Sequence, residues 1–113
     1  MKKKENSPDE SIHIGGRLYI QPTDVIMLVA NVNYTTIYLI NGQQFMIART
    51  IGKVQEILHP HGQFIRTNKA QVVNLAYVLQ HTKKGFVLQN NEVIDWSRRR
   101  KKEIKEKLRR IYK

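Results

Sequence analysis

The sequence of 113 residues contains no cysteine. Disulfide bonds, thiolate nucleophiles and cysteine-ligated zinc sites are therefore excluded. No apolar run approaches the roughly 20 residues that a membrane-spanning helix needs, and the first ten residues lack the apolar stretch of a secretory signal. Acidic residues are also scarce, since nine Asp and Glu stand against 20 Lys and Arg, for a formal net charge of +11. These shortages indicate a cytoplasmic domain that attracts polyanions and needs no membrane.

The positive charge is concentrated at the C-terminal end. Residues 98–113 carry ten Lys and Arg against two acids, whereas residues 11–97 carry seven against four. The uninterrupted basic run at residues 98–102 destabilises a fold by self-repulsion unless a partner neutralises it. A solvated basic tail is the simpler interpretation, but the density of charge favours a segment that binds a polyanion.

Short apolar runs dominate the body of the sequence and indicate its fold class. They are rich in β-branched and aromatic residues, which favour strands. Asn41-Gly42 marks a tight hairpin, because both residues tolerate positive φ. The pattern predicts a mostly β fold of small antiparallel sheets, with strands at residues 12–14, 18–20, 25–30, 34–40, 43–48, 64–67, 72–73, 77–80, 86–89 and 92–96.

Two segments change to helical spacing. Residues 50–59 place apolar side chains on one face, with Thr50 as a plausible N-cap and Pro60 as the stop. The pattern is helical again from Ser97 to the C-terminus. This second helix is basic and has a narrow apolar face made of Ile104, Leu108 and Ile111.

The sequence shows no repeat and no internal domain boundary. Residues 1–10 are polar and are expected to form a disordered leader. We expect a folded domain at residues 11–105 and a basic helical extension at residues 106–113.

Motifs for catalysis are absent. There is no glycine-rich phosphate loop, dinucleotide fingerprint or zinc-protease helix, and the few acids of the body are too scattered for a carboxylate pair. His59-Pro60-His61 lies between helix-breaking residues and is typical of a surface loop rather than a metal site. We therefore expect no enzyme, no cofactor and no metal.

Three polar islands interrupt the apolar pattern, at residues 31–35, 66–69 and 97–99. Together they hold Asn, Thr, Tyr, Lys and Arg, which are side chains that reach base edges: Arg and Lys pair with guanine, Asn with adenine and Thr with either. Turn chemistry alone explains each Asn-rich loop taken singly. Ser97 alone could be an ordinary helix cap. The three islands together with the net charge favour binding of nucleic acid.

The order of several motifs is more specific than their composition. The strings NYT, ART, VNL and SRR follow one another within the segments 23–30, 33–39, 48–54, 64–66, 72–78 and 97–99. This order and spacing resemble the LytTR family of bacterial DNA-binding domains, which serve as output domains of response regulators. The resemblance covers roughly residues 12–105.

The resemblance implies an elongated, mostly β fold whose loops, rather than a recognition helix, enter successive major grooves and bend the duplex. It implies a transcriptional regulator that binds double-stranded DNA at promoter direct repeats, with a second copy on the adjacent repeat. The base-reading positions of the family fall on Asn33, Tyr34, Asn68, Lys69 and Arg99. Phosphate contacts would then fall on Arg66, Arg98 and Lys101.

The chain departs from the family pattern in two places. Many members have His-Arg-Ser or a similar string where this chain has Asn68-Lys69-Ala70, so the preferred DNA sequence should differ. Many members also carry a receiver domain, but only about ten residues precede the fold here. We expect a chain that stands alone, with an excised domain as the alternative, and in either case no phospho-relay control within this chain.

Two other functions stay open at this point. Small basic β domains also bind RNA, although the aromatic residues here form no evident stacking platform. The basic C-terminal helix could instead contact a membrane surface or a protein partner, although its apolar face is narrow.

Overall fold

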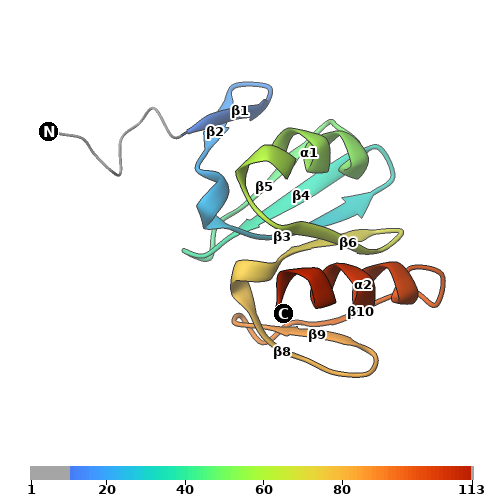
Figure 1. Ribbon diagram of the computed structural model, residues 1–113. Coiled ribbons are helices and arrows are strands. Elements are labelled where there is room, and N and C mark those ends of the chain that lie inside the picture. The colour runs from blue at the N-terminus through green and yellow to red at the C-terminus, as the bar shows by residue number, and fades with distance from the viewer. Residues whose placement is uncertain (1–10, 113) are drawn as a thin grey trace, which may run out of the picture.

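The computed structural model describes residues 11–112 (Figure 1). In this range the chain forms three small antiparallel sheets and two α-helices, so the mostly β prediction is confirmed. The described part measures 42 × 35 × 23 Å along its principal axes. The expected leader at residues 1–10 lies outside the described residues.

The largest sheet has the strand order β5-β4-β3-β7-β6 and forms the centre of the molecule. A hairpin of β1 and β2 forms a second sheet, and β10-β9-β8 form the third. The strands are β1 (Ile12–Gly15), β2 (Leu18–Ile20), β3 (Val25–Asn31), β4 (Tyr34–Leu39), β5 (Gln44–Ile47), β6 (Phe64–Asn68), β7 (Gln71–Asn74), β8 (Val78–His81), β9 (Gly85–Leu88) and β10 (Val93–Asp95). The predicted strands all appear, and each strand end matches the prediction or differs from it by one residue.

Local chemistry explains two of the turns. Gly42 has a φ of 87° in the β4–β5 hairpin, and the Asn41 side-chain oxygen accepts a hydrogen bond of 2.9 Å from the Gln43 amide. Gly85 serves a different purpose, because a Cβ there would lie 1.9 Å from the carbonyl oxygen of Ile94. Only glycine lets β10 approach β9 this closely.

The first helix, α1 (Ile51–Leu58), forms as predicted. The Thr50 hydroxyl oxygen accepts a hydrogen bond of 3.3 Å from the Lys53 amide, which is an N-cap contact. Pro60 lies within a 3-10 turn, η3 (His59–His61), that follows α1 directly. Two further 3-10 turns, η2 (Pro22–Asp24) and η4 (Leu75–Tyr77), lead into β3 and β8.

The second helix, α2 (Lys101–Ile111), begins four residues later than the sequence predicted. The amide of Arg100 donates to the Ser97 carbonyl at 3.1 Å and to the Ser97 hydroxyl at 3.3 Å, so Ser97 closes a turn before the helix rather than capping it. Ile104 and Leu108 are buried as expected, but Ile111 is 38% exposed. The apolar face of α2 is therefore shorter than predicted.

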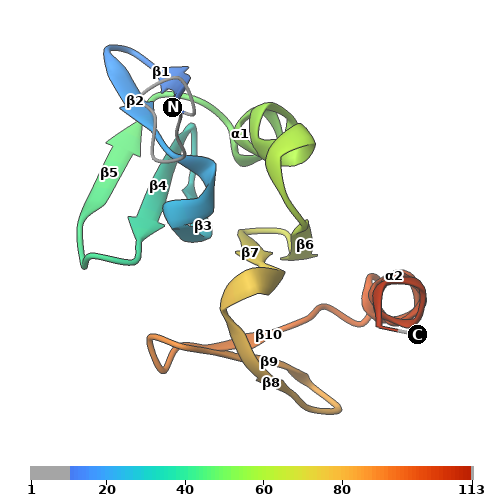
Figure 2. The same cartoon turned by 60° about the vertical axis from the view of Figure 1, so that its left-hand side comes forward.

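Two hydrophobic cores lie on opposite faces of the central sheet. Figure 2 shows the elements on each side, with α1 and the β1–β2 hairpin apart from α2 and β8–β10. The first core lies between the sheet, α1 and the β1–β2 hairpin, and the second between the sheet, the third sheet and α2. Neighbours in one strand face opposite cores, as Phe64 and Ile65 of β6 do. Phe86 and Trp96 meet edge to face in the second core, with ring centroids 5.3 Å apart. These contacts fix α2 and β8–β10 against the sheet.

Candidate nucleic-acid interface

The first two polar islands lie side by side at one end of the central sheet. The β3–β4 turn follows Asn31, and the β6–β7 turn precedes Gln71. Because β3 and β7 are paired antiparallel, the end of one lies beside the start of the other, with Val29 opposite Gln71. The amide of Ala30 also donates a hydrogen bond of 2.7 Å to the carbonyl of Ala70. The two turns therefore project from the same edge.

The third island is tied to the second by two hydrogen bonds. The Ser97 amide donates to the Thr67 carbonyl at 2.8 Å, and the Asn68 side-chain amide donates to the Asp95 carbonyl at 2.7 Å. These contacts hold the turn that leads into α2 against the end of β6. The fold thus brings together three segments that are up to 68 residues apart in the chain, from Asn31 to Arg99.

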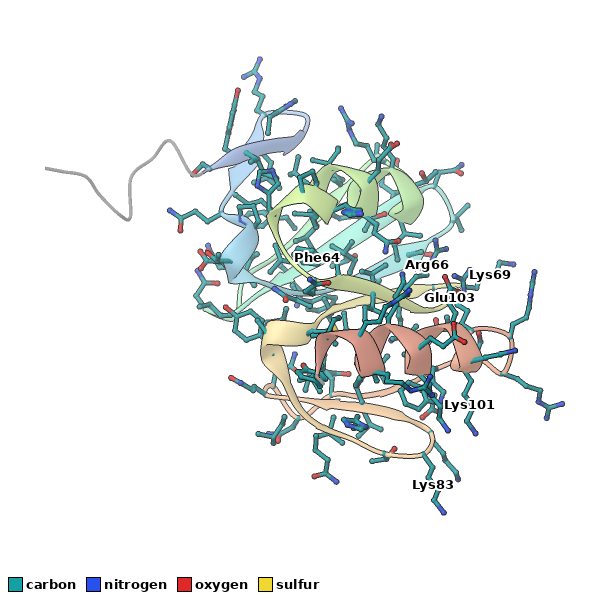
Figure 3. The ribbon with its side chains drawn as sticks, in the orientation of Figure 1. Phe64, Arg66, Lys69, Lys83, Lys101 and Glu103 are labelled. Atoms are coloured by element: carbon teal, nitrogen blue, oxygen red, sulfur yellow. The ribbon has the colours of Figure 1, made fainter. Side chains whose placement is uncertain are left out.

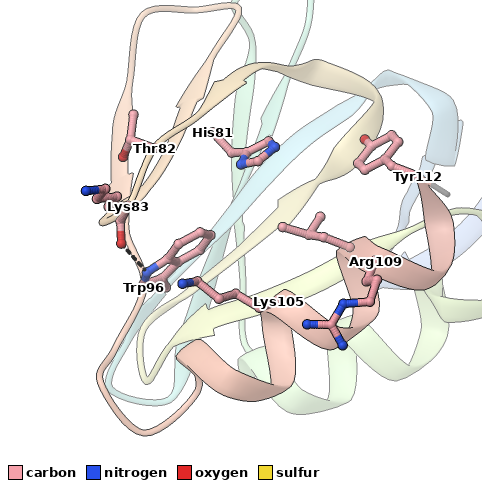
Figure 4. Close-up of a pocket in the computed structure, with 8 residues that line it drawn as sticks. His81, Thr82, Lys83, Trp96, Lys105, Arg109 and Tyr112 are labelled. Atoms are coloured by element: carbon pink, nitrogen blue, oxygen red, sulfur yellow. Dashed lines mark hydrogen bonds between the residues drawn. The ribbon is translucent and has the colours of Figure 1, made fainter.

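A fourth turn, between β8 and β9, belongs to the same edge and was missed in the sequence. The Trp96 amide donates to the Lys84 carbonyl at 2.9 Å, and the Trp96 indole N–H donates to the Lys83 carbonyl at 3.2 Å (Figure 4). The sequence pattern predicted only the two strands on either side of this turn, at residues 77–80 and 86–89. The two adjacent lysines were the signal that could have marked it. Figure 3 shows Lys69, Lys83 and Lys101 projecting on one side of the molecule.

We call this surface the loop edge and define it as residues 31–34, 67–71, 82–85 and 96–101. Asn33 and Tyr34 are exposed at the β3–β4 turn, and Lys69 is exposed at the β6–β7 turn. Arg98, Arg99 and Lys101 are exposed before and at the start of α2. The structure therefore brings together the residues that the resemblance implied, and leaves these six accessible to solvent.

Asn68 differs from these six because its side chain is engaged within the fold. Its amide nitrogen donates to the Gln71 side-chain oxygen at 2.7 Å as well as to the Asp95 carbonyl. Its amide oxygen accepts a hydrogen bond of 2.9 Å from Ala70. Both ends of the amide group have partners, so Asn68 braces the second and third islands.

Arg66 also braces the β6–β7 turn. Its guanidinium donates to the Asn68 carbonyl at 3.0 Å from Nε and to the Lys69 carbonyl at 2.6 Å from Nη2. Burial and, to a smaller extent, the nearby charge of Arg100 lower the pKa of Arg66. The guanidinium remains protonated at neutral pH. Burial is the larger cause of this lowering, and the positive charge of Arg100 adds a repulsion that a bound anion would relieve.

The cations of the loop edge have no acidic partners among the described residues. Within residues 11–112 the one ion pair joins Lys53 to Glu56 at 3.5 Å, within α1. An uncompensated row of lysines and arginines is the electrostatic pattern of a phosphate-binding surface. In the same range no group of three or more His, Cys, Asp or Glu could hold a metal ion, and no helix is long and apolar enough to cross a membrane.

Comparisons with known proteins concern the family and the fold of the chain. The family profile described as the LytTr DNA-binding domain matches residues 15–109. Among solved structures, the fold is similar to a LytTr DNA-binding domain from Bacillus cereus, with a TM-score of 0.69 and 13% identity over 92% of this chain and 98% of that one. A search of curated proteins found no match. The structural likeness supports the fold, and the profile covers most of the sequence. The chain belongs to the LytTR family of DNA-binding domains.

Proposed function

We propose that the chain is a sequence-specific transcriptional regulator that acts in the cytoplasm and grips double-stranded DNA with its loop edge. One observation carries the proposal: four turns from distant parts of the chain are joined by hydrogen bonds into a single edge whose cations lack acidic partners in the described range. Turns held in this way can enter a major groove as a rigid unit. Membership of a family of DNA-binding domains is the reason to propose DNA as the ligand of this surface.

The exposed side chains divide into two roles. Arg98 and Lys101 bind phosphates. Arg98 lies in the turn before α2 and Lys101 begins the helix, and a phosphate contact requires only a nearby positive charge. Asn33, Tyr34, Lys69 and Arg99 read bases, because each is exposed on a turn of the loop edge. Lys83 and Lys84 add phosphate contacts from the fourth turn.

Two of the residues first assigned to DNA act mainly by positioning. Asn68 holds the β6–β7 turn against β10, and Arg66 braces the same turn internally by donating to the carbonyls of Asn68 and Lys69. Arg66 keeps unused N–H donors that can still reach a phosphate. Asn68 fixes the position of the turn that carries Lys69, and it does not itself need to contact a base.

The site on DNA is proposed to be a promoter direct repeat, with one copy of the chain on each repeat. The test is selection of bound duplexes from a random pool, followed by competition at equal salt with scrambled duplex and with single-stranded RNA. We expect one recurring motif that repeats in tandem, and at least a tenfold preference for it over both competitors. Selection that yields no motif would contradict sequence-specific binding. Preference for the RNA would move the function to the alternative class.

A further inference from the structure

Val32 has a backbone conformation that β-branched residues rarely adopt. It lies at the tip of the β3–β4 turn with a φ of 58°, and only one other non-glycine residue in the described range, Asn91, has a positive φ. Asn tolerates this conformation, whereas a β-branched side chain is strained in it. The position is one where glycine or asparagine is the usual choice.

No contact within the fold compensates for the strain at Val32. The Val32 side chain is 87% exposed, the highest fraction among the exposed large hydrophobic residues, and it belongs to neither hydrophobic core. Its isopropyl group has no hydrogen-bonding atoms. Neither packing nor turn geometry therefore explains a valine here. Strained residues that persist in this way concentrate at functional sites.

We propose that Val32 reads a thymine through apolar contact with its C5-methyl group in the major groove. The proposal rests on the function proposed above, in which the β3–β4 turn enters that groove beside Asn33 and Tyr34. The thymine methyl is the apolar feature that distinguishes a base pair in the major groove. Contact with it would bury the isopropyl group that the free protein exposes.

The test replaces each thymine of the selected duplex in turn by deoxyuridine, which removes only the methyl group. With the wild-type chain we expect one position to lose about fourfold in affinity, equivalent to one buried methyl group. Val32→Ala should bind the thymine duplex more weakly and lose nothing further at that position. Val32→Asn should raise the melting temperature, because it relieves strain, while losing the same preference.

Ile40→Ala is the matched control. Ile40 is also β-branched and 51% exposed, but it follows β4 at the opposite end of the central sheet. Its substitution should leave the deoxyuridine profile of the wild type unchanged. The inference is overturned if no deoxyuridine position distinguishes Val32→Ala from wild type. If the wild type selects no duplex at all, it is the proposed function that has failed.

A different observation concerns a groove of about 600 Å³ between α2 and the β8–β9 hairpin (Figure 4). Buried Trp96 and Leu108 contribute its apolar lining, and Tyr112 adds a second aromatic ring. Lys83, Lys105 and Arg109 contribute positive charge, and no acidic residue lines it. The α2 residues recur at helical spacing, so one face of the helix forms one wall.

We infer that this groove binds a small aromatic anion. Its volume lies in the range of ligand sites, two aromatic rings offer apolar contact, and three cations with no acidic neighbour in the lining complement a carboxylate or phosphate. The opposite side of α2 provides a natural comparison. Lys107 and Arg110 face a separate hollow beside Gln63 and Phe64.

The probe is 1-naphthoate, compared with uncharged 1-naphthamide, and binding is followed without DNA. Trp96 is the single tryptophan of the chain, so its indole N–H gives one isolated signal in the nuclear magnetic resonance spectrum. We expect naphthoate to shift this signal with saturation and to bind at least tenfold more tightly than the amide. The double variant Lys105→Gln/Arg109→Gln should weaken naphthoate about tenfold.

The control variant, Lys107→Gln/Arg110→Gln, removes the same charge from the other side of α2 and should leave binding unchanged. Equal binding of acid and amide, equal losses in the two double variants, or no saturation would each overturn the site. Because no DNA is present, these outcomes leave the proposed regulator function untouched.

Discussion

Single residues at the loop edge differ in whether their polar atoms face the fold or the solvent. The side-chain amide of Asn68 forms hydrogen bonds with three partners within the fold, whereas the side chain of its neighbour Lys69 is exposed. From the sequence alone, both residues are predicted to contact DNA. The hydrogen bonds separate a residue that shapes the surface from one that can contact the duplex.

Substitution of these two neighbours should separate the roles. Asn68→Ala should lower the free energy of unfolding by about 1–2 kcal/mol, because it leaves the Asp95 carbonyl and the Ala70 amide without their partner. Lys69→Ala should change stability by less than about 0.5 kcal/mol while weakening DNA binding. Urea unfolding and duplex titration measure the two effects. An Asn68→Ala protein of wild-type stability that alters preference at a single base pair would instead make Asn68 a base reader.

Arg99 offers a test of base reading itself. A guanidinium can bind both major-groove acceptors of one guanine, which a phosphate contact does not require. Arg99→Ala should cost about 1–3 kcal/mol on the selected duplex and much less on random duplex. Arg98→Ala is the control, because Arg98 is exposed in the same turn and should weaken both duplexes alike. Equal losses in the two variants on both duplexes would end the assignment.

At the scale of elements, α2 crosses the predicted boundary between the domain at residues 11–105 and the extension at residues 106–113. The expected extension at residues 106–113 starts in the middle of an unbroken helix, and Leu108 belongs to the second core. Only the outer face of this segment is free to act on a partner. Removal of the whole extension would therefore disturb the fold as well as the charge, so single substitutions are the better probes.

Leu108→Ala should lower the free energy of unfolding by about 2–5 kcal/mol, as expected for a large buried side chain cut to alanine. Ile111→Ala should cost less, because Ile111 is 38% exposed whereas Leu108 is 7% exposed. Urea unfolding followed by Trp96 fluorescence measures both. Equal losses in the two variants would show that α2 packs more evenly along its length than its burial indicates.

Much of the fold could be predicted from local sequence. Asn41-Gly42 and the Thr50 cap act through neighbouring residues in the chain. The predictions of the β4–β5 hairpin and of the start of α1 were therefore correct. The start of α2 was wrong, because the Ser97 amide is bonded to Thr67, 30 residues away. The brace at Asn68 depends on Asp95 in the same way. Contacts between distant segments leave no local pattern, which is why the candidate site was located but its bracing was not.

At the scale of the whole molecule, the positive charge divides into two regions. Figure 1 shows α2 starting at the loop edge and running away from it. With 11 residues it spans about 16 Å, so its last turn lies well behind the surface that we propose to bind DNA. Arg98 and Lys101 are at the loop edge, whereas Lys107 and Arg110 are not. The charge pattern of the sequence predicted that residues 98–113 bind a single polyanion as one segment. In the fold, the two ends of this segment lie at opposite ends of α2.

Salt dependence of DNA binding should reveal this division. If the loop edge neutralises about six phosphates, the slope of log affinity against log salt is about −5, since each contact contributes about −0.9. Lys83→Gln/Lys84→Gln removes two contacts and should make the slope shallower by about two. Arg109→Gln/Arg110→Gln removes the same charge from the last turn of α2 and should leave the slope within about 0.5 of wild type. These two residues lie about 12–14 Å along the helix axis from Lys101. That distance exceeds the Debye length of about 10 Å in 0.1 M salt, so their charges are largely screened from the duplex. Titrations at four or more salt concentrations with the selected duplex measure all three slopes. If the distal pair changes the slope as much as the lysine pair, the duplex wraps along α2, and the DNA-binding surface extends beyond the loop edge.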